Sequence, residues 1–254
     1  MKYDSASALL ATRSTLRRQD TLLALATGFV ALITGATVIL WAGGAGWELV
    51  PGGSVPYLVI GAVVMARIDR YHPHDRFGIA NAITLSRAVI NCLLIGLLVE
   101  HDTLFTSWGE RADWLFFAAA AVSLSLDGVD GAAARRQGLT SRFGARFDME
   151  IDALLLMLLA VAAIALDKVG AWVLLIGTTY YLFMAARALV PRLRRDLPES
   201  MRRKAVCVLQ GAVLIALVTP FITGVAATAL ALTALVALAW SFTVDIIWLM
   251  ARRR

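Results

Sequence analysis

The chain has 254 residues, of which 59% are apolar, and its mean hydropathy is +0.74. This composition indicates a polytopic membrane protein and excludes an ordinary soluble domain. The net charge is +6. The basic residues stand at the ends of apolar runs, where they are typical of cytoplasmic loops, so a nucleic-acid partner is not expected.

Residues 1–20 carry basic side chains among leucines, which suits either a short helix on the membrane surface or a disordered basic tail. Eight apolar runs follow that we expect to cross the bilayer as helices. The run 56–66 is marginal by length and follows a Gly/Pro-rich turn at 43–51, so a re-entrant segment is the alternative there. The expected spans are 21–41, 56–66, 77–99, 114–135, 147–166, 169–189, 205–223 and 225–250.

The distribution of basic residues supports a topology with eight spans. With the N-terminus inside, the outer loops contain only Arg111 and Lys168 of the 24 basic residues. If 56–66 did not cross the membrane, the basic loops and the loops poor in basic residues would no longer alternate between the two sides. Otherwise, the basic N-terminus would have to lie outside. We therefore expect a multi-pass protein of the cell (inner or plasma) membrane, with both termini and the active site at the cytoplasmic face.

The stretch 127–152 places several carboxylates within an apolar region. At about 100° per residue on an α-helix, Asp127, Asp130, Gly131, Ala134 and Arg135 share one face. Charged groups are costly in a membrane span, so a function is the default hypothesis for this face. The small residues on it would let a bulky ligand approach the backbone closely.

Asp148 and Asp152 are four residues apart and share a face of a second helix. A helix–loop–helix hairpin that joins them to the first two aspartates would form an all-oxygen site. Because no His or Cys lies nearby in the sequence, this site suits Mg²⁺ or Mn²⁺ and not Zn²⁺. The alternative is a structural cluster of carboxylates neutralised by Arg135, Arg142 and Arg146.

Asn81, Thr84 and Arg87 recur every three residues near the start of the span 77–99. One interpretation is hydrogen bonding between helices, with an arginine that extends to the membrane surface. The other is a set of donors for a phosphate and a nucleotide.

The aspartate stretch resembles the complete signature of the CDP-alcohol phosphotransferase family, with all eight fixed positions matched. The pattern reads Asp127-x2-Asp130-Gly131-x2-Ala134-Arg135-x8-Gly144-x3-Asp148-x3-Asp152. The resemblance implies an all-α integral membrane protein whose six-helix catalytic core occupies 77–254. Residues 1–76, with an amphipathic segment and two extra transmembrane helices, precede this core.

The resemblance also implies an activity in phospholipid biosynthesis. A phospho-alcohol group would pass from a CDP-alcohol, such as CDP-diacylglycerol, to the hydroxyl of a small polar acceptor, with release of CMP. Two Mg²⁺ (or Mn²⁺) ions are implied, one on Asp127, Asp130 and Asp148 and the other on Asp127, Asp148 and Asp152. Asp152 corresponds to the general base. A homodimer is implied as well.

Further positions match the family's contacts with the CDP group, and they are Gly131, Ala134, Arg135 and Gly144. Ser141 stands where the family often has a hydroxyl that contacts the nucleotide. Asn81 and Thr84 resemble part of an element near the start of the family's first core helix. The family usually has proline before the asparagine, where this chain has Ala80.

The acceptor is defined less well than the donor. Basic residues that could bind an acceptor phosphate are Arg87, Arg142, Arg146, Arg187, Arg203 and Lys204. For each of the last five alone, a charge that fixes the cytoplasmic orientation is the favoured explanation. The pattern Ser200-x3-Lys204-x5-Gln210 faintly resembles a segment of phosphatidylglycerophosphate synthases, but it has Arg203 in place of a glycine and Cys207 in place of a threonine. Glycerol 3-phosphate is therefore one expectation, and inositol-type and other polyol acceptors stay open.

Two other classes of protein are distant rivals. Membrane prenyltransferases also use aspartates and Mg²⁺ on a diphosphate, but they separate their motifs by far more than the 17 residues between Asp130 and Asp148 and lack the Gly-x2-Ala-Arg element. A divalent-cation transporter should carry carboxylates near the bilayer midplane on several helices, whereas these lie at one end of two expected helices.

Overall fold

The computed structural model describes residues 2–43, 45–137, 141–195, 197–198 and 200–251, with side chains from residue 14 onward except at 105 and 128–137. These ranges are almost entirely helical and contain no strand. The long helices are α1 (Lys2–Trp41), α2 (Leu49–Tyr71), α3 (Ile79–Val99), α5 (Glu110–Gln137), α6 (Arg142–Ala165), α7 (Leu174–Leu189), α8 (Met201–Leu217) and α9 (Gly224–Ala251). The short ones are α4 (His101–Trp108), η1 (Ala171–Val173) and η2 (Pro191–Arg194).

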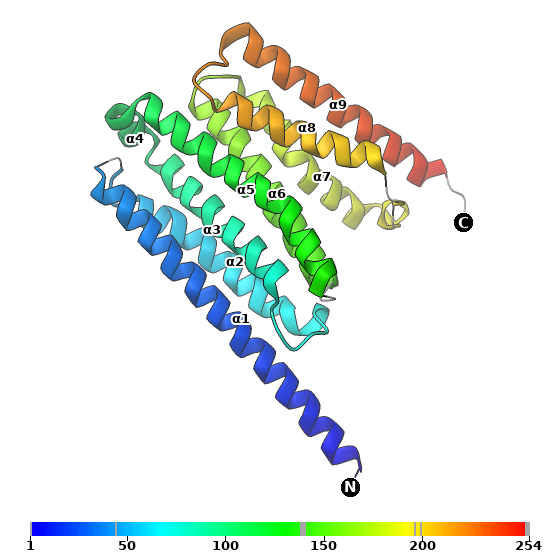
Figure 1. Cartoon of the computed structure of the whole chain (residues 1–254). Helices are drawn as coiled ribbons and strands as arrows, with labels where there is room; N and C mark the ends of the chain where they lie inside the picture. The colour runs from blue at the N-terminus through cyan, green and yellow to red at the C-terminus, as the bar shows by residue number, and fades with distance from the viewer. Residues whose placement is uncertain (1, 44, 138–140, 196, 199, 252–254) are drawn as a thin grey trace. The chain divides into compact units, whose positions relative to one another are not determined.

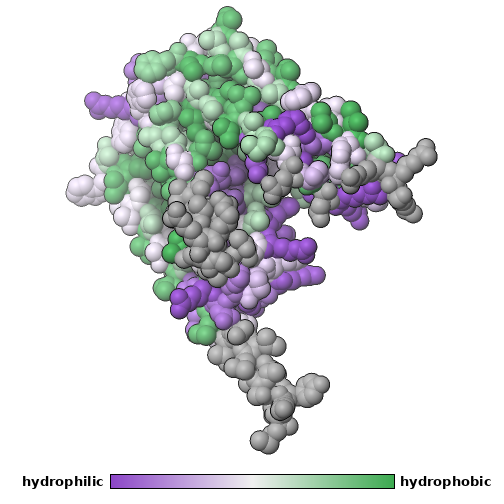
Figure 2. Space-filling model, turned by 45° about the vertical axis from the view of Figure 1, so that its right-hand side comes forward, coloured by the Kyte–Doolittle hydropathy of each residue, from purple (hydrophilic) through white to green (hydrophobic). Residues whose placement is uncertain are grey.

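The fold confirms the prediction of an all-α membrane protein. Within the described ranges, five helices are long and apolar enough to span a bilayer, namely Ser14–Trp41, Leu49–Tyr71, Ile79–Val99, Ala171–Leu189 and Gly224–Ala251. Large apolar side chains such as Trp41 and Val225 are exposed, and Figure 2 shows broad apolar areas on the surface. Lipid contact explains such exposure. The further spans predicted at α5, α6 and α8, and the orientation, stay predictions.

The N-terminal part differs from its prediction in two ways. Residues 2–20 do not form a separate surface element, because α1 is one continuous helix of 40 residues. The second apolar run extends well beyond 56–66, because α2 begins at Leu49 and has 23 residues. At about 1.5 Å per residue this helix is long enough to cross a bilayer.

Gly52, in the first turn of α2, allows this helix to pack tightly against α3. A Cβ atom on Gly52 would lie 3.1 Å from the Cα of Gly96, and one on Gly96 would lie 2.5 Å from the carbonyl oxygen of Leu49. Small residues let two membrane helices approach at backbone distance. Of the Gly/Pro-rich segment 43–51, the described residues up to Glu48 are non-helical, and only the last three residues belong to α2.

The chain forms two compact units. The first comprises residues 1–112 and 118–152, and the second comprises residues 113–117 and 153–254. In the first unit, α1, α2 and α3 lie side by side (Figure 1). The predicted boundary between 76 and 77 therefore falls inside a compact unit, and its role as a domain boundary stays a prediction.

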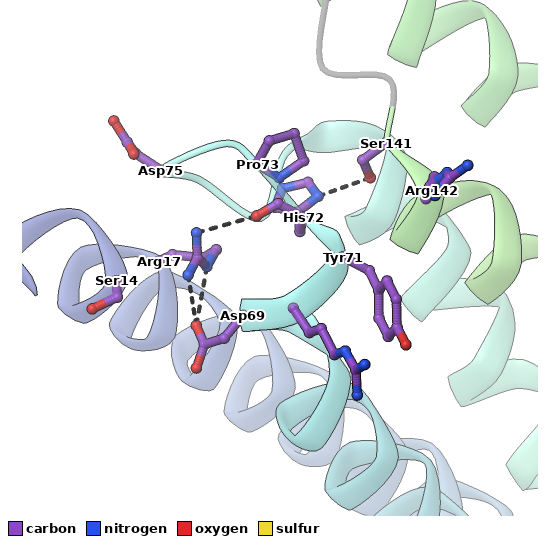
Figure 3. Close-up of a pocket in the computed structure, with 10 residues that line it drawn as sticks. Ser14, Arg17, Asp69, Tyr71, His72, Pro73, Asp75, Ser141 and Arg142 are labelled. Atoms are coloured by element: carbon purple, nitrogen blue, oxygen red, sulfur yellow. Dashed lines mark hydrogen bonds and ion pairs between the residues drawn. The ribbon is translucent and has the colours of Figure 1, made fainter. Parts of the chain in front are cut away.

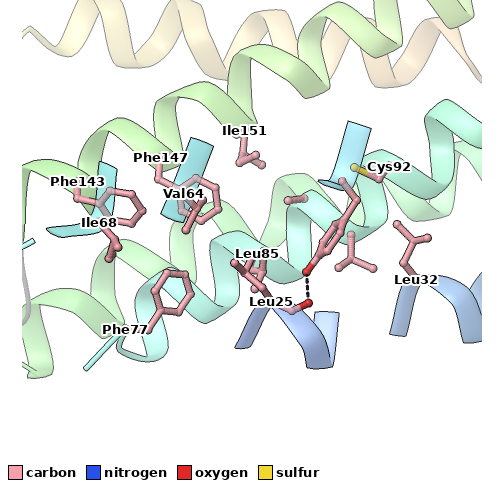
Figure 4. Packing of buried hydrophobic residues seen from close by; sticks show 13 residues of the cluster. Leu25, Leu32, Val64, Ile68, Phe77, Leu85, Cys92, Phe143, Phe147 and Ile151 are labelled. Atoms are coloured by element: carbon pink, nitrogen blue, oxygen red, sulfur yellow. Dashed lines mark hydrogen bonds between the residues drawn. The ribbon is translucent and has the colours of Figure 1, made fainter. Parts of the chain in front are cut away.

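The core of the first unit joins the N-terminal helices to α3 and to the start of α6. Figure 4 shows this core, in which the hydroxyl of Tyr57 on α2 donates to the carbonyl of Leu25 on α1 at 2.8 Å. The cluster consists of Leu25, Leu32, Tyr57, Val64, Ile68, Phe77, Leu85, Ala88, Val89, Cys92, Phe143, Phe147 and Ile151. Burial of this apolar surface fixes α6 against the helices that carry the polar residues described below.

In the second unit, α8 packs against α9. Arg202 on α8 donates to the carboxylate of Asp245 on α9, and Arg203 donates to the same carboxylate at 3.3 Å. Asp245 is 7% exposed. This buried carboxylate is paired with two partly buried arginines, and pairing is the usual condition for a carboxylate in a membrane helix.

Candidate metal centre

Three of the four signature aspartates converge at one place in the first unit. Asp127 comes from α5, and Asp148 and Asp152 come from successive turns of α6. One carboxylate oxygen from each lies within 4.8 Å of the other two, and each side chain is partly buried. Asp130 also lies on α5, but its side chain is outside the described residues.

This donor set fits a hard divalent cation. The oxygens come from carboxylates alone, which Mg²⁺ and Mn²⁺ accept readily and Zn²⁺ rarely uses exclusively. Mg²⁺ lies about 2.0–2.1 Å from its ligands, so bound oxygens are at most about 4.2 Å apart. A separation of up to 4.8 Å needs only small side-chain rotations to reach that geometry.

Arg87 on α3 points its guanidinium into the same cluster. Its side chain has no exposed surface, and Nη1 donates to Asp148 at 2.6 Å and to Asp127 at 3.3 Å. Nη2 donates to Asp152, and Nε donates to the carbonyl of Ser123 at 3.0 Å. The planar fork of arginine suits this multiple pairing. Arg87 thus contacts three carboxylates and one backbone carbonyl, whereas the sequence suggested it as a contact of the acceptor.

A second polar contact lies one turn further along α3. Asn91 accepts a hydrogen bond from the hydroxyl of Ser123 at 2.9 Å and donates to the carbonyl of Ile151 at 3.2 Å. Asn91 and Ser123 have no exposed surface. These bonds tie α5 and α6 to α3 next to the carboxylates. The sequence analysis missed both residues, and the available signal was the position of Asn91 four residues after Arg87.

Three of the predicted nucleotide contacts lie together. Asn81 is buried and donates to the carbonyl of Phe77 at 2.5 Å. A Cβ atom on Gly144 would lie 2.8 Å from the Oδ1 of Asn81 and 3.3 Å from the Oγ of Ser141. Thr84, one turn after Asn81, is buried as well. Position 144 therefore leaves no room for a side chain beside these polar groups.

Ser141 caps the N-terminus of α6. Its Oγ accepts the backbone N–H of Gly144 at 3.0 Å, which is the usual N-cap bond to the third residue of a helix. The same Oγ lies 2.8 Å from the Nδ1 of His72, a residue that the sequence analysis did not single out. Burial, with the nearby charges of His74 and Arg17, lowers the pKa of His72 below its ordinary range.

The structure gives less detail on the other predicted contacts with the donor and the acceptor. Gly131, Ala134 and Arg135 lie on α5, with side chains outside the described residues. Arg142 is exposed, and Arg146 pairs with Glu150 at 2.7 Å. Arg187 and Lys204 belong to the second unit, where Arg187 donates to the carbonyl of Arg194 at 2.9 Å.

Comparison with known proteins gives one match. A sequence model described as CDP-alcohol phosphatidyltransferase matches residues 77–245. A search among curated proteins and a search among solved structures gave no match. The matched range covers more than half of the chain and contains the aspartates, Arg87 and Asn81, whereas α1, α2 and His72 precede it.

Proposed function

The chain belongs to the CDP-alcohol phosphatidyltransferase family, and we propose that its donor is CDP-diacylglycerol and its acceptor a small polar alcohol. Family membership makes the protein a transferase of substituted phosphate groups that takes a phosphatidyl group from a CDP-alcohol. CMP is the proposed second product. We place the reaction at the cytoplasmic face of the cell membrane because of the distribution of basic residues, and we expect a homodimer by resemblance to the family.

The observation that carries this proposal is the convergence of Asp127, Asp148 and Asp152 within 4.8 Å. By resemblance to the family, Asp130 would join them and the four would hold two Mg²⁺ or Mn²⁺ ions. Such ions neutralise the charge of a diphosphate and stabilise the leaving nucleotide phosphate.

We propose that Arg87 orients these carboxylates. It contacts all three described members of the cluster from a position with no exposed surface. A cation in this position reduces the repulsion between the carboxylates. The cluster would therefore be largely organised before a divalent cation binds.

For the donor, we propose a site beside Asn81, Ser141 and Gly144. The missing side chain at position 144 supports this assignment, because it lets the backbone of α6 lie directly against the side chains of Asn81 and Ser141, so that the three residues stand together. Thr84, Gly131, Ala134 and Arg135 are further donor contacts by resemblance alone, and we propose them on that basis.

For the acceptor hydroxyl, we propose Asp152 as the general base. Its carboxylate is 25% exposed, so an acceptor could reach it, and its bond to Arg87 fixes its orientation. An alcohol phosphate such as glycerol 3-phosphate is the first acceptor to test, because Arg142 or Arg146 in the first unit could hold its phosphate. Arg187 and Lys204, in the second unit, are separate candidates for the same role. An inositol-type polyol is the alternative.

The decisive experiment uses the purified full-length protein with CDP-diacylglycerol, Mg²⁺ or Mn²⁺, and a panel of acceptors. We expect CMP release that depends on one acceptor, with the phospholipid product identified by mass spectrometry. Absence of CMP release with every acceptor would overturn the proposed donor. Release of inorganic diphosphate from a prenyl diphosphate in a parallel assay would favour a prenyltransferase.

A further inference from the structure

His72, in the link between α2 and α3, makes a contact that joins the N-terminal helices to the proposed donor site. Its ring is 2% exposed, and both ring nitrogens are bonded, Nδ1 to the Oγ of Ser141 and Nε2 to the carbonyl of Arg76, each at 2.8 Å. Figure 3 shows the contact with Ser141 in the wall of a pocket of about 710 Å³.

The partners of His72 define its protonation state. The carbonyl of Arg76 can only accept, so Nε2 carries a hydrogen and donates it. The Oγ of Ser141 already accepts the N–H of Gly144, and its own hydroxyl hydrogen can be donated to Nδ1. A neutral His72 with its hydrogen on Nε2 therefore satisfies every group in this chain of bonds.

The first helix holds the segment that carries His72. Arg17 on α1 donates to the carbonyl of His72 at 3.1 Å and to Asp69 at 2.8 Å, as Figure 3 shows. Asp20, also on α1, accepts the backbone N–H of Phe77 at 2.7 Å. The link between α2 and α3 is thus fixed to α1 on both sides of His72.

Aromatic packing holds the same ring against α6. The rings of His72 and Phe143 meet edge to face with centroids 5.8 Å apart, and Phe143 is 6% exposed in the first turn of α6. Phe147, one turn later, stacks on Phe143 at 5.7 Å. Edge-to-face and stacked pairs restrict the orientation of both partners.

We propose that His72 is a positioning residue for the CDP-alcohol site. Its ring holds Ser141 and the first turn of α6 in place. The two helices that precede the family-matched range act on the reaction through this residue. The inference rests on the proposed function, because the site in question is the proposed donor site. It assigns to residues 14–76 a part in shaping that site in addition to membrane anchoring.

Two substitutions separate the two bonds of the ring. The amide oxygen of His72→Asn lies near the former position of Nδ1 and can still accept from Ser141, whereas the longer side chain of His72→Gln reaches the position of Nε2 and can bond only Arg76. His101→Gln is the matched control, because His101 lies on α4 and pairs with Asp102 at the surface.

With CDP-diacylglycerol as the probe, we expect His72→Gln to raise the KM for the donor about tenfold with a smaller change in kcat, consistent with the loss of one hydrogen bond. His72→Asn and His101→Gln should stay within about twofold of the wild type. Ser141→Ala should raise the same KM, and adding His72→Gln to it should have no further effect, because the two residues act through one bond. Equal losses in the Asn and Gln variants, or additive losses in the double variant, would overturn the inference.

Hydrogen exchange of residues 141–147 gives a readout that needs no turnover. We expect faster exchange in His72→Gln than in His72→Asn, because the cap of α6 loosens only in the former. If the wild type released no CMP, the proposed function would fail, and this exchange difference would still test the positioning role. Identical exchange in the two variants would refute that role.

Discussion

The Nη1 of Arg87 donates to the Oδ1 of Asp148 at 2.6 Å across 61 residues of sequence. The arginine has no exposed surface, whereas the aspartate side chain is 32% exposed. The pair thus joins a fully buried cation to a carboxylate that faces the site. Because the same guanidinium also contacts Asp127 and Asp152, the charge on α3 sets the geometry of carboxylates on two other helices.

Replacing Arg87 with methionine should destabilise the protein and make its stability depend on divalent cations. Three carboxylates would lose their shared cation, which costs about 3 kcal/mol at the lower end of the range for buried pairs, since these carboxylates are partly exposed. Melting in detergent should show a larger rise on addition of Mg²⁺ in Arg87→Met than in the wild type, because the ion would replace the lost charge. If Arg87→Met and the wild type had the same melting temperature without Mg²⁺, the central place of Arg87 in the cluster would be contradicted.

Asp152→Asn should abolish CMP release while leaving binding of the CDP-alcohol largely intact. A positioned general base contributes about 10²- to 10⁴-fold to a rate, and asparagine cannot accept the proton. Turnover and donor binding should be measured on the same preparation. Glu150→Gln is the matched control on α6, because Glu150 pairs with Arg146 outside the carboxylate cluster, and its turnover should match the wild type. Loss of folding in Asp152→Asn would indicate a structural carboxylate instead.

Removal of divalent cations should stop the reaction reversibly. The described ligand set contains only carboxylate oxygens, so Mg²⁺ and Mn²⁺ should restore activity after chelation and Zn²⁺ should not. To measure the recovery of activity, the protein is dialysed against EDTA, each metal is added separately, and CMP release is assayed. Full activity in EDTA would exclude a metal-dependent mechanism.

Gly144→Ala should weaken donor binding. The added Cβ atom would lie 2.8 Å from Asn81 and 3.3 Å from Ser141, and overpacking of this kind costs about 1–3 kcal/mol. The KM for CDP-diacylglycerol should rise, with a smaller loss in the melting temperature. Gly61→Ala on α2 is the control, because its Cβ atom would meet Leu25 at an ordinary 3.6 Å. Equal behaviour of the two variants would argue against a donor site beside Asn81 and Ser141.

Acidification should destabilise the wild type more than His72→Asn. The pKa of His72 in the folded protein is lowered by burial from an ordinary value of about 6.5, so the unfolded chain binds the proton more tightly. The stability that His72 contributes is fully present above pH 6.5 and is lost as the pH falls through the folded value. Melting temperatures of both proteins between pH 8 and pH 5 measure the difference. Parallel curves would show that His72 does not titrate with unfolding.

Local sequence was sufficient to predict the all-helical class and to predict that Asp148 and Asp152 lie on one face of a helix. High hydropathy predicted membrane helices, and the spacing of Asp148 and Asp152 placed them on one face of α6. Local signals placed the start of the second helix too late, at residue 56, whereas α2 begins at Leu49 and includes Gly52 and Gly53. There the glycines meet α3 at backbone distance, and this packing overrides their weak helix propensity.

The sequence by itself determined the candidate residues for the chemistry, because the types and spacing of the signature aspartates are local properties of two helices. Only the tertiary structure decided what those residues contact. The bond from Arg87 to Asp152 spans 65 residues and that from His72 to Ser141 spans 69. Such pairs follow from the burial of apolar faces of α1, α2, α3 and α6 in one core, and no periodicity within a single helix encodes which faces meet.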